Sequence, residues 1–192
     1  MIEKMVITKM TSEKNSFSPL SQEKAVPLLR TESEKWLTKL SEEEIRAIKK
    51  YTKNSGDPRD DKFYLRLNAM LRGAKPENET LRYYAELISD ALRKNNLQYD
   101  ILCYRSMNFN PFHDVSTGDY VFPQQFMSTS VTKSGALKDS FRMIVRVPAG
   151  AVGAYIEKLS RYPKQREFLL DKDCIYQVTA MQKDCIELEV VV

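Results

Sequence analysis

The stretch Phe141–Val147 reads FRMIVRV, and it alternates between apolar and charged residues as a β-strand does. Its odd positions are apolar, whereas Arg142 and Arg146 occupy even positions. Successive side chains of a strand point to opposite faces, so the apolar residues share one face and both arginines share the other. This stretch therefore predicts a sheet in the second half of the chain, with one face buried in a core.

Other segments from residue 99 onward have the same character. They are short and rich in β-branched and aromatic residues, which favours strands over helices. The expected strands cover residues 99–104, 124–131, 167–170, 174–180 and 185–192. Residues 108–123 contain Gly118, two prolines and several aromatic residues, and we interpret them as a long surface loop.

The first half of the chain carries helical signals instead. Two Ser/Thr-x-x-Glu patterns, beginning at Thr31 and Ser41, fit capping boxes that satisfy free backbone N–H groups at a helix start. Apolar residues recur at helical spacing over residues 63–71, and again after Pro76. Four helices are therefore expected, with a turn at residues 54–58.

Length and composition set the domain organisation. The chain has 192 residues, of which 42% are hydrophobic, and this is enough for one compact domain with a substantial core. We therefore predict a single α+β domain over residues 1–192, in which a mainly helical part (1–98) packs on a β-rich part (99–192).

Charge and hydropathy argue against two classes of function. The 30 Lys and Arg residues against 26 Asp and Glu give a net charge of +4, spread along the chain, which is too little to indicate nucleic-acid binding. No apolar stretch is long enough to span a bilayer, and charged residues interrupt residues 1–10, so neither membrane insertion nor a signal peptide is expected. We expect a monomer.

The metal-ligating residue types follow no metal-site pattern. Cys103, Cys174 and Cys185 lie in apolar or alternating stretches, and we interpret them as buried thiols rather than as a disulfide. His113 is the only histidine, and its neighbours form neither a metal site nor a catalytic triad. We therefore predict no bound metal.

Three short stretches of the β-rich half combine into a chemical pattern. They are Arg105 at a strand end, Ser128 in a Ser-Thr-Ser strand, and Gln165 with Glu167 after a proline-containing turn. Cleavage of a glycosidic bond develops positive charge on the sugar, and a carboxylate such as Glu167 stabilises that charge. Ser128 could orient the carboxylate, and the guanidinium of Arg105 suits a phosphate. Gln165 would lie on the same side of an extended segment as Glu167.

This order of Arg, Ser-Thr-Ser and Gln-x-Glu resembles the bacterial mono-ADP-ribosyltransferase toxins. The helical element from Asn68 to Arg72 is similar to the family's Asn-x-x-Leu-Arg, whose Asn and Arg contact NAD, and Tyr51-Thr52 resembles a pair found upstream. The resemblance implies that NAD is the co-substrate and that it binds in a cleft between two mostly antiparallel sheets. It implies Arg105, Asn68 and Arg72 as NAD-binding residues.

The Gln-x-Glu variant is similar to the botulinum exoenzyme type, which modifies an asparagine of Rho GTPases. The resemblance therefore implies Glu167, Gln165 and Ser128 as catalytic residues and a Rho-type GTPase as the protein partner. Tyr162 occupies the position of an aromatic residue that helps to dock the GTPase, so Tyr162 and Gln165 are implied in substrate recognition. The resemblance also implies a secreted bacterial protein that acts in the host-cell cytosol.

The chain departs from the family pattern in two places. Ser106 stands where the family usually has glycine, and Leu137 falls where it has an aromatic residue facing nicotinamide. After a shift of register, Lys138 or Phe141 with Arg142 could serve instead, and Arg142 is included among the expected NAD-binding residues. Two other functions stay open: modification of guanine in DNA, and a catalytically silent module that binds a partner protein.

Overall fold

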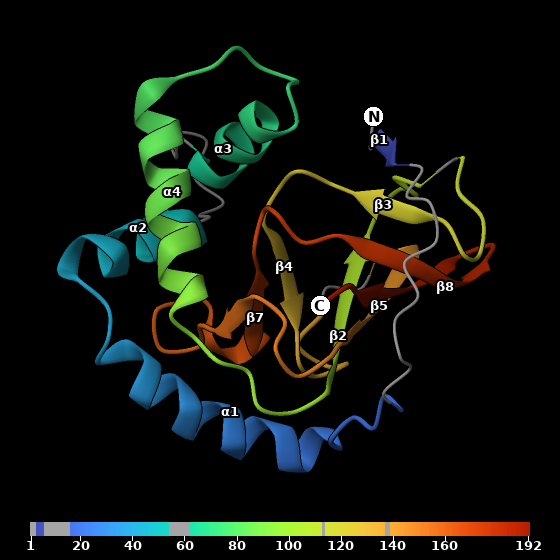
Figure 1. Cartoon of the computed structure of the whole chain (residues 1–192), viewed down its shortest axis with the longest axis horizontal. Coiled ribbons are helices and arrows are strands. Elements are labelled where there is room, and N and C mark those ends of the chain that lie inside the picture. Colours follow the sequence, from blue (N-terminus) through green and yellow to red (C-terminus); the bar gives the residue numbers. More distant parts are fainter. Residues whose placement is uncertain (1–2, 6–15, 54–61, 113, 137–138) are drawn as a thin grey trace.

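The computed structural model describes residues 3–5, 16–53, 62–112, 114–136 and 139–192. Within these residues, four α-helices precede most of the sheet, as Figure 1 shows. They are α1 (Gln22–Leu37), α2 (Glu42–Thr52), α3 (Phe63–Leu71) and α4 (Glu79–Arg93). A short 3-10 helix, η1, spans Pro163–Gln165. The predicted α+β class is confirmed.

Nine strands lie within the described residues and form one hydrogen-bonded sheet, in the order β1-β3-β8-β9-β5-β2-β4-β7-β6. The strands are β1 (Glu3–Met5), β2 (Ile101–Met107), β3 (Tyr120–Phe122), β4 (Met127–Ser130), β5 (Phe141–Val147), β6 (Gly153–Tyr155), β7 (Glu167–Leu170), β8 (Tyr176–Gln182) and β9 (Cys185–Val190). Only β5 and β9 pair in parallel among them. The sheet is therefore mixed and mostly antiparallel, as expected.

The two halves of this sheet meet at a narrow joint. Strands β2 and β4 pair only through Tyr104 and Ser130, whereas β2 and β5 pair along seven residues. The two separate sheets implied by the sequence are thus joined into one ladder at a single residue pair. On one side of the joint lie β1, β3, β8, β9, β5 and β2, and on the other lie β4, β7 and β6.

Two hydrophobic cores cover the sheet on its two faces. The first contains Ala25 and Leu29 of α1 together with residues of β2, β5, β8 and β9. The second lies between α2, α3 and α4 and the short strands β6 and β7. Strand β7 contributes to both, since Phe168 packs in the first core and Leu169 in the second. This explains why all four residues of β7 are buried.

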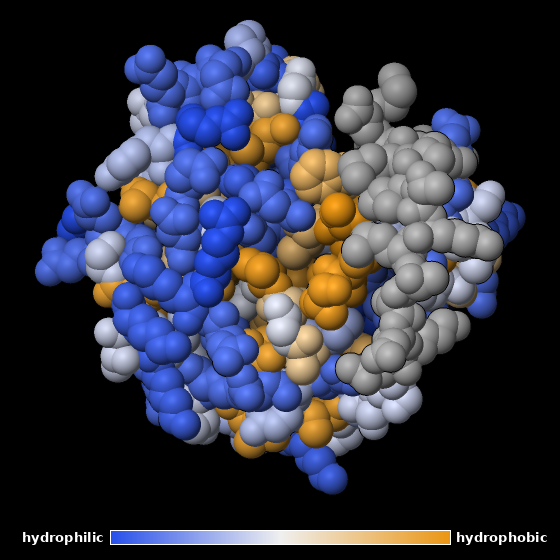
Figure 2. All heavy atoms as spheres, viewed as in Figure 1, coloured by the Kyte–Doolittle hydropathy of each residue, from blue (hydrophilic) through white to orange (hydrophobic). Residues whose placement is uncertain are grey.

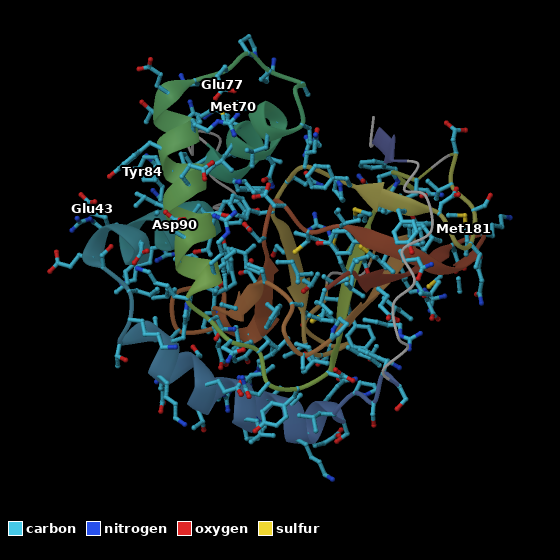
Figure 3. All side chains as sticks on the ribbon, in the orientation of Figure 1. Glu43, Met70, Glu77, Tyr84, Asp90 and Met181 are labelled. Atoms are coloured by element: carbon cyan, nitrogen blue, oxygen red, sulfur yellow. The ribbon has the colours of Figure 1, made fainter. Side chains whose placement is uncertain are left out.

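The helical half is held together by aromatic and cationic contacts. Tyr84 of α4, labelled in Figure 3, meets the ring of Phe63 edge-on with centroids 5.1 Å apart. The ammonium of Lys50 lies 4.4 Å from the Tyr84 centroid and 4.7 Å from that of Phe63. Each such contact adds about 0.5–1 kcal/mol. They fix α2, α3 and α4 in one unit, far from Met181 at the other side of the view in Figure 3.

The predicted helix starts have mixed outcomes. Ser41 caps α2 as expected, since its hydroxyl accepts from the Glu44 N–H at 3.2 Å and the Glu44 carboxylate accepts from the Ser41 N–H at 2.7 Å. The predicted start at Thr31 is wrong. Helix α1 begins at Gln22 and continues through Pro27, and the Thr31 hydroxyl donates to the Pro27 carbonyl inside the helix.

The predicted strands agree with the sheet in most places. Strands β5 and β7 have the predicted bounds, and β2, β4, β8 and β9 fall within or beside the expected ranges. Strand β3 lies inside the segment interpreted as a loop, and β1 and β6 were not expected. Each of these three strands has only three residues, too few for a recognisable alternation. The predicted turn at residues 54–58 and His113 lie outside the described residues.

The state of the cysteines, the character of the helices and the hydropathy of the surface complete the description of the fold. The three cysteines are buried and free, and burial raises the pKa of Cys103 to about 12. In the described part of the chain, no helix has the length and apolar character needed to cross a bilayer. Figure 2 shows hydrophilic side chains over the helical half, with apolar side chains gathered in the middle of the face towards the strands.

Candidate active site

A cavity of about 280 Å³ opens at the joint of the sheet, where α2 and α3 approach the ends of β2, β4 and β7. It is lined by Tyr51, Thr52, Tyr64, Leu65, Asn68, Arg72, Tyr104, Arg105, Ser106, Gln125, Ser128, Thr129, Ser130, Gly135, Ala136, Tyr162, Gln165 and Glu167. Eight different residues were predicted for the site, and seven of them line this cavity, whereas Arg142 does not.

Glu167 is the first residue of β7, and its side chain is held by hydroxyl groups on both carboxylate oxygens. The Ser128 hydroxyl donates to Oε1 at 2.5 Å, and the Ser160 hydroxyl donates to Oε2 at 3.0 Å. Glu167 is only 6% exposed, so water competes little for these bonds. The carboxylate is therefore fixed in one orientation at the wall of the cavity.

Burial and hydrogen bonding act on this carboxylate in opposite directions. Burial raises the pKa of Glu167 above its ordinary value, while the two serine hydroxyls and the nearby Arg105 charge oppose the rise. Among the described residues, no lysine or arginine lies within ion-pairing distance of Glu167. The carboxylate thus keeps unused capacity to interact with positive charge in the cavity.

Ser128 reaches the carboxylate although Ser130 is the direct cross-strand neighbour of Glu167. In the β4–β7 pair, Ser130 lies opposite Glu167 and Ser128 lies opposite Leu169. Ser128 is thus the diagonal neighbour of Glu167 on the same face, within reach of a long side chain. The Ser130 hydroxyl donates instead to the Thr132 carbonyl and shapes the loop after β4.

Arg105 crosses the joint between the two halves of the sheet. It belongs to β2, and its guanidinium donates to the carbonyl of Ser128 in β4 at 2.6 Å. This bond uses one of the five N–H donors of the guanidinium. The other N–H donors of the guanidinium can therefore bind a ligand in the cavity.

Asn68 presents a buried polar atom that lacks a partner. Its side-chain nitrogen donates to the Tyr51 hydroxyl at 3.0 Å and lies 3.5 Å from the Phe126 carbonyl, while within the described residues its Oδ1 has no hydrogen bond. A buried acceptor without a donor is costly. Asn68 is one of the residues that line the cavity.

Arg72 follows the last residue of α3 and lies at the edge of the same cavity. Its guanidinium donates to the side-chain oxygen of Gln125, which precedes β4. Partial burial lowers the pKa of Arg72, but an arginine remains charged at neutral pH. Arg72 and Arg105 therefore supply two positive charges to one cavity.

Gln165 and Tyr162 reach the cavity by a route that the sequence did not predict. Gln165 ends η1 rather than lying in an extended segment, and Arg166 adopts a left-handed conformation with φ of 51°. The predicted extended geometry of Gln165 and Glu167 is therefore wrong, although both side chains line the cavity. The Arg166 guanidinium forms an ion pair with Glu157, which holds this turn.

A glycine brings a second loop against this turn. A Cβ on Gly135 would lie 2.5 Å from the Gln165 carbonyl oxygen and 2.4 Å from the Ser130 hydroxyl oxygen. Contacts this short leave no room for a side chain, so the loop after β4 packs directly on the backbone of Gln165.

Arg142 is not brought to the cavity. It lies on β5 with its side chain 61% exposed, and it forms an ion pair with Asp184 at 3.2 Å. Its predicted role in NAD binding is not supported by this position, because a β-strand directs it away from the cavity wall. Leu137 and Lys138 lie outside the described residues.

Several residues of the site were not predicted from the sequence. Ser160 follows no motif, and Gln125 lies in a loop where a glutamine carries no pattern. Gly135 offered a signal, since the chain has only six glycines. The described residues contain no cluster of His, Cys, Asp or Glu that could hold a metal ion.

The model of the ADP-ribosyltransferase exoenzyme family matches residues 30–187, which include every residue of the site described above. The chain belongs to this family. NAD is the co-substrate of ADP-ribosyltransferases, and the expected resemblance to the bacterial toxins is confirmed.

Relatives support this assignment. The NAD(+)–arginine ADP-ribosyltransferase EFV of Enterococcus faecalis is 31% identical over 162 residues, covering 78% of this chain but only 31% of that relative. Among solved structures, the toxin Plx2a of Paenibacillus larvae has a TM-score of 0.73 and 22% identity, over 91% of this chain and 98% of its own. The C3 exoenzyme of Clostridium limosum has a TM-score of 0.73 and 19% identity, over 93% and 98%. Both structures share the fold.

Proposed function

We propose that this chain is a mono-ADP-ribosyltransferase toxin that cleaves NAD and transfers ADP-ribose to an asparagine of a Rho-type GTPase. The observation that carries the proposal is the buried Glu167 carboxylate, fixed by two serine hydroxyls in a cavity that also holds Gln165. Residues 1–192 are proposed to act as one catalytic domain.

The groups of the cavity fit a dinucleotide with a negatively charged pyrophosphate. Arg105 and Arg72 supply guanidinium groups, which bind phosphate oxygens with fixed geometry. The unpaired Oδ1 of Asn68 would accept a hydrogen bond from a sugar hydroxyl or an amide. When bound, NAD supplies the ADP-ribose group and nicotinamide as the leaving group.

Glu167 is proposed to be the catalytic carboxylate. Positive charge develops on the ribose as the bond to nicotinamide breaks, and a fixed negative group beside it stabilises the transition state more than the ground state. Ser128 holds one oxygen of that group and thus removes the cost of orienting it during the reaction. A carboxylate that forms no ion pair with any of the described residues is suited to this task.

Gln165 is proposed to orient the acceptor. Its amide can donate to the oxygen of an acceptor asparagine and accept from its nitrogen. Tyr162, the residue directly before η1, is 38% exposed and lines the cavity, and an exposed aromatic ring is a suitable anchor for a protein partner. Together they favour a protein substrate over a free small molecule.

The Gln165→Ala variant tests this division of roles. With labelled NAD and a purified Rho GTPase, we expect transfer to fall by about tenfold or more, because the acceptor is no longer oriented. Nicotinamide release in the absence of the GTPase should stay within a few-fold of the wild-type rate. Equal loss of both activities would contradict a role confined to the acceptor.

An arginine acceptor is a second candidate, favoured by one observation. The Enterococcus faecalis relative is named an NAD(+)–arginine ADP-ribosyltransferase. Agmatine, a small guanidine, distinguishes the two candidates, because an arginine-specific enzyme would label it and an asparagine-specific enzyme would label only the GTPase. Gln165 is the feature of this chain that favours asparagine.

The remaining properties follow from the proposed reaction. The chain is proposed to be secreted by a bacterium and to act as a monomer in the host-cell cytosol, where Rho GTPases and NAD occur together. It needs neither nucleic acid nor membrane insertion for this activity. Gel filtration and labelling of a lysate with NAD would check these points.

A further inference from the structure

Ser160 lies between the catalytic carboxylate and the turn that carries Tyr162 and Gln165. Its hydroxyl donates to Oε2 of Glu167 at 3.0 Å and accepts from the backbone N–H of Tyr162 at 3.2 Å. One oxygen atom therefore connects the carboxylate to Tyr162, the first residue of the turn formed by residues 162–165. No sequence motif pointed to this serine.

The backbone around Ser160 is fixed from two sides. Its N–H donates at 2.8 Å to the carbonyl of Ile156, the residue directly after β6. The next N–H, of Arg161, donates to the hydroxyl of Thr52 at the end of α2 at 3.3 Å. Ser160 is thus held by the sheet and by the helical half at once, and its hydroxyl has a defined position.

We propose that Ser160 is a positioning residue, which fixes the second oxygen of the Glu167 carboxylate and joins its orientation to that of the Tyr162–Gln165 turn. This inference rests on the proposed role of Glu167 in NAD cleavage. It adds a second hydroxyl to the one supplied by Ser128, from a different segment of the chain.

Two donors are needed because the terminal torsion of a glutamate is broad. A carboxylate held through one oxygen can still rotate about its last bond, since that torsion has no sharp staggered minimum. Ser128 holds Oε1 from β4, and Ser160 holds Oε2 from the loop after β6. With both bonds in place, the plane of the carboxylate is set before substrate arrives, which is the preorganisation that electrostatic catalysis requires.

The charged and titratable groups that face Glu167 come from several elements. Arg105 on β2 favours the ionised carboxylate, and the hydroxyls of Ser128 and Ser160 do the same. Tyr51 on α2 also faces Glu167, and burial raises its pKa, so it stays neutral. Removal of the Ser160 hydroxyl therefore leaves burial less opposed, and the pKa of Glu167 rises further.

The Ser160→Ala variant should change the pH dependence of the reaction as well as its rate. Because the ionised form of Glu167 is the active one, the acid limb of the kcat profile for NAD hydrolysis should move to higher pH. At the pH optimum kcat should fall by about tenfold, the usual effect of losing one hydrogen bond to a charged group. Ser160→Thr keeps a hydroxyl and should restore the position of the acid limb.

Ser89→Ala is a matched control for a merely structural effect. The Ser89 hydroxyl donates to the buried carboxylate of Asp171 at 2.6 Å, away from the cavity. This variant loses the same type of bond, so its stability should fall while the acid limb of hydrolysis stays in place. Carbon-13 NMR of the Glu167 carboxyl group in the free protein gives the same comparison without an activity measurement.

The outcomes separate this inference from the proposed function. A raised Glu167 titration in Ser160→Ala, absent in Ser160→Thr and Ser89→Ala, supports the positioning role. An unchanged titration and acid limb in a folded Ser160→Ala protein overturns it, while the proposed function stands if Glu167→Gln still abolishes hydrolysis. Hydrolysis that survives in Glu167→Gln overturns the proposed function and this inference together.

Discussion

Two buried glutamates of this molecule, Glu44 and Glu167, both accept hydrogen bonds from serine, but their other partners differ. Glu44 is 4% exposed in the capping box of α2, and Glu167 is 6% exposed at the start of β7. Glu44 accepts from the Ser41 N–H and forms an ion pair with Lys94 at 2.6 Å. Glu167 accepts only from the hydroxyls of Ser128 and Ser160 among the described residues.

The difference in partners reverses the effect on the two carboxyl groups. Burial favours the protonated form at both positions, but at Glu44 the Lys94 ammonium and the helix cap offset it, so the pKa of Glu44 is lowered. At Glu167 burial prevails and the pKa is raised. A carboxylate that is fully neutralised stabilises the fold, whereas one held by neutral donors stays available for a cationic transition state. A serine–glutamate pair therefore stabilises the fold at Ser41 and Glu44, whereas at Ser128 and Glu167 it holds a carboxylate ready for chemistry.

Glu167→Gln should have the largest effect on activity. The amide keeps the shape of the side chain but lacks the negative charge, so kcat for NAD hydrolysis and for transfer should fall by at least about 10²- to 10³-fold. Nicotinamide release measured by chromatography would check this. Wild-type-like release would remove Glu167 from the mechanism.

The stability of this variant has a predictable sign. A carboxyl group with a raised pKa contributes stability below its ordinary pKa, and that contribution is lost as the pH rises through the raised value. At neutral pH Glu167→Gln should therefore unfold at the same temperature as the wild type or higher.

Glu44→Gln is the matched control for this variant. It should keep activity and lose about 1–3 kcal/mol of unfolding free energy, since Lys94 is 39% exposed and its charge is partly screened.

Ser128→Ala should have an intermediate effect, on activity rather than on stability. Loss of a hydrogen bond to a charged group corresponds to about a 10- to 100-fold decrease in kcat. The KM for NAD should change less, because Ser128 acts through Glu167 rather than on the substrate. Steady-state kinetics would show the split, and a loss confined to KM would mean that Ser128 contacts NAD instead.

Ser41→Ala should have the smallest effect, and it should fall on stability alone. Removing an N-cap hydroxyl costs about 1 kcal/mol, because the Glu44 N–H loses its partner. Urea unfolding would measure this, with NAD hydrolysis as the second readout. A decrease in activity comparable to that of Ser128→Ala would show that the Ser41–Glu44 pair also contributes to catalysis, and would contradict its purely structural role.

The sequence was informative where a pattern is local. Alternation in residues 141–147 predicted the bounds of β5, and the pattern at Ser41 predicted the start of α2. A comparable pattern at Thr31 was misleading, because tertiary packing of Ala25 and Leu29 on the sheet carries α1 through it. The motif residues Arg105, Ser128 and Glu167 were brought to one cavity as expected.

The remaining parts of the site depend on how distant segments meet. Ser160 reaches Glu167 because the loop after β6 returns beside β7, and no local pattern encodes that approach. Gln165 was expected in an extended segment, but Arg166 turns the chain in the left-handed region, which a single sequence rarely indicates for arginine. Arg142 was selected for its charge, and its strand directs it to Asp184 instead.

The single residue pair between β2 and β4 has a consequence for inhibitors. Arg105 belongs to one half of the sheet and Glu167 to the other, and among the strand pairs of the described residues only Tyr104–Ser130 joins the two halves, beside the bond from Arg105 to the Ser128 carbonyl. A compound that binds between β2 and β4 and separates them would move the Arg105 guanidinium away from the Glu167 carboxylate without imitating any part of NAD. Selectivity over the many NAD enzymes of a host cell would then come from this boundary between the two halves of the sheet rather than from the dinucleotide that they all share.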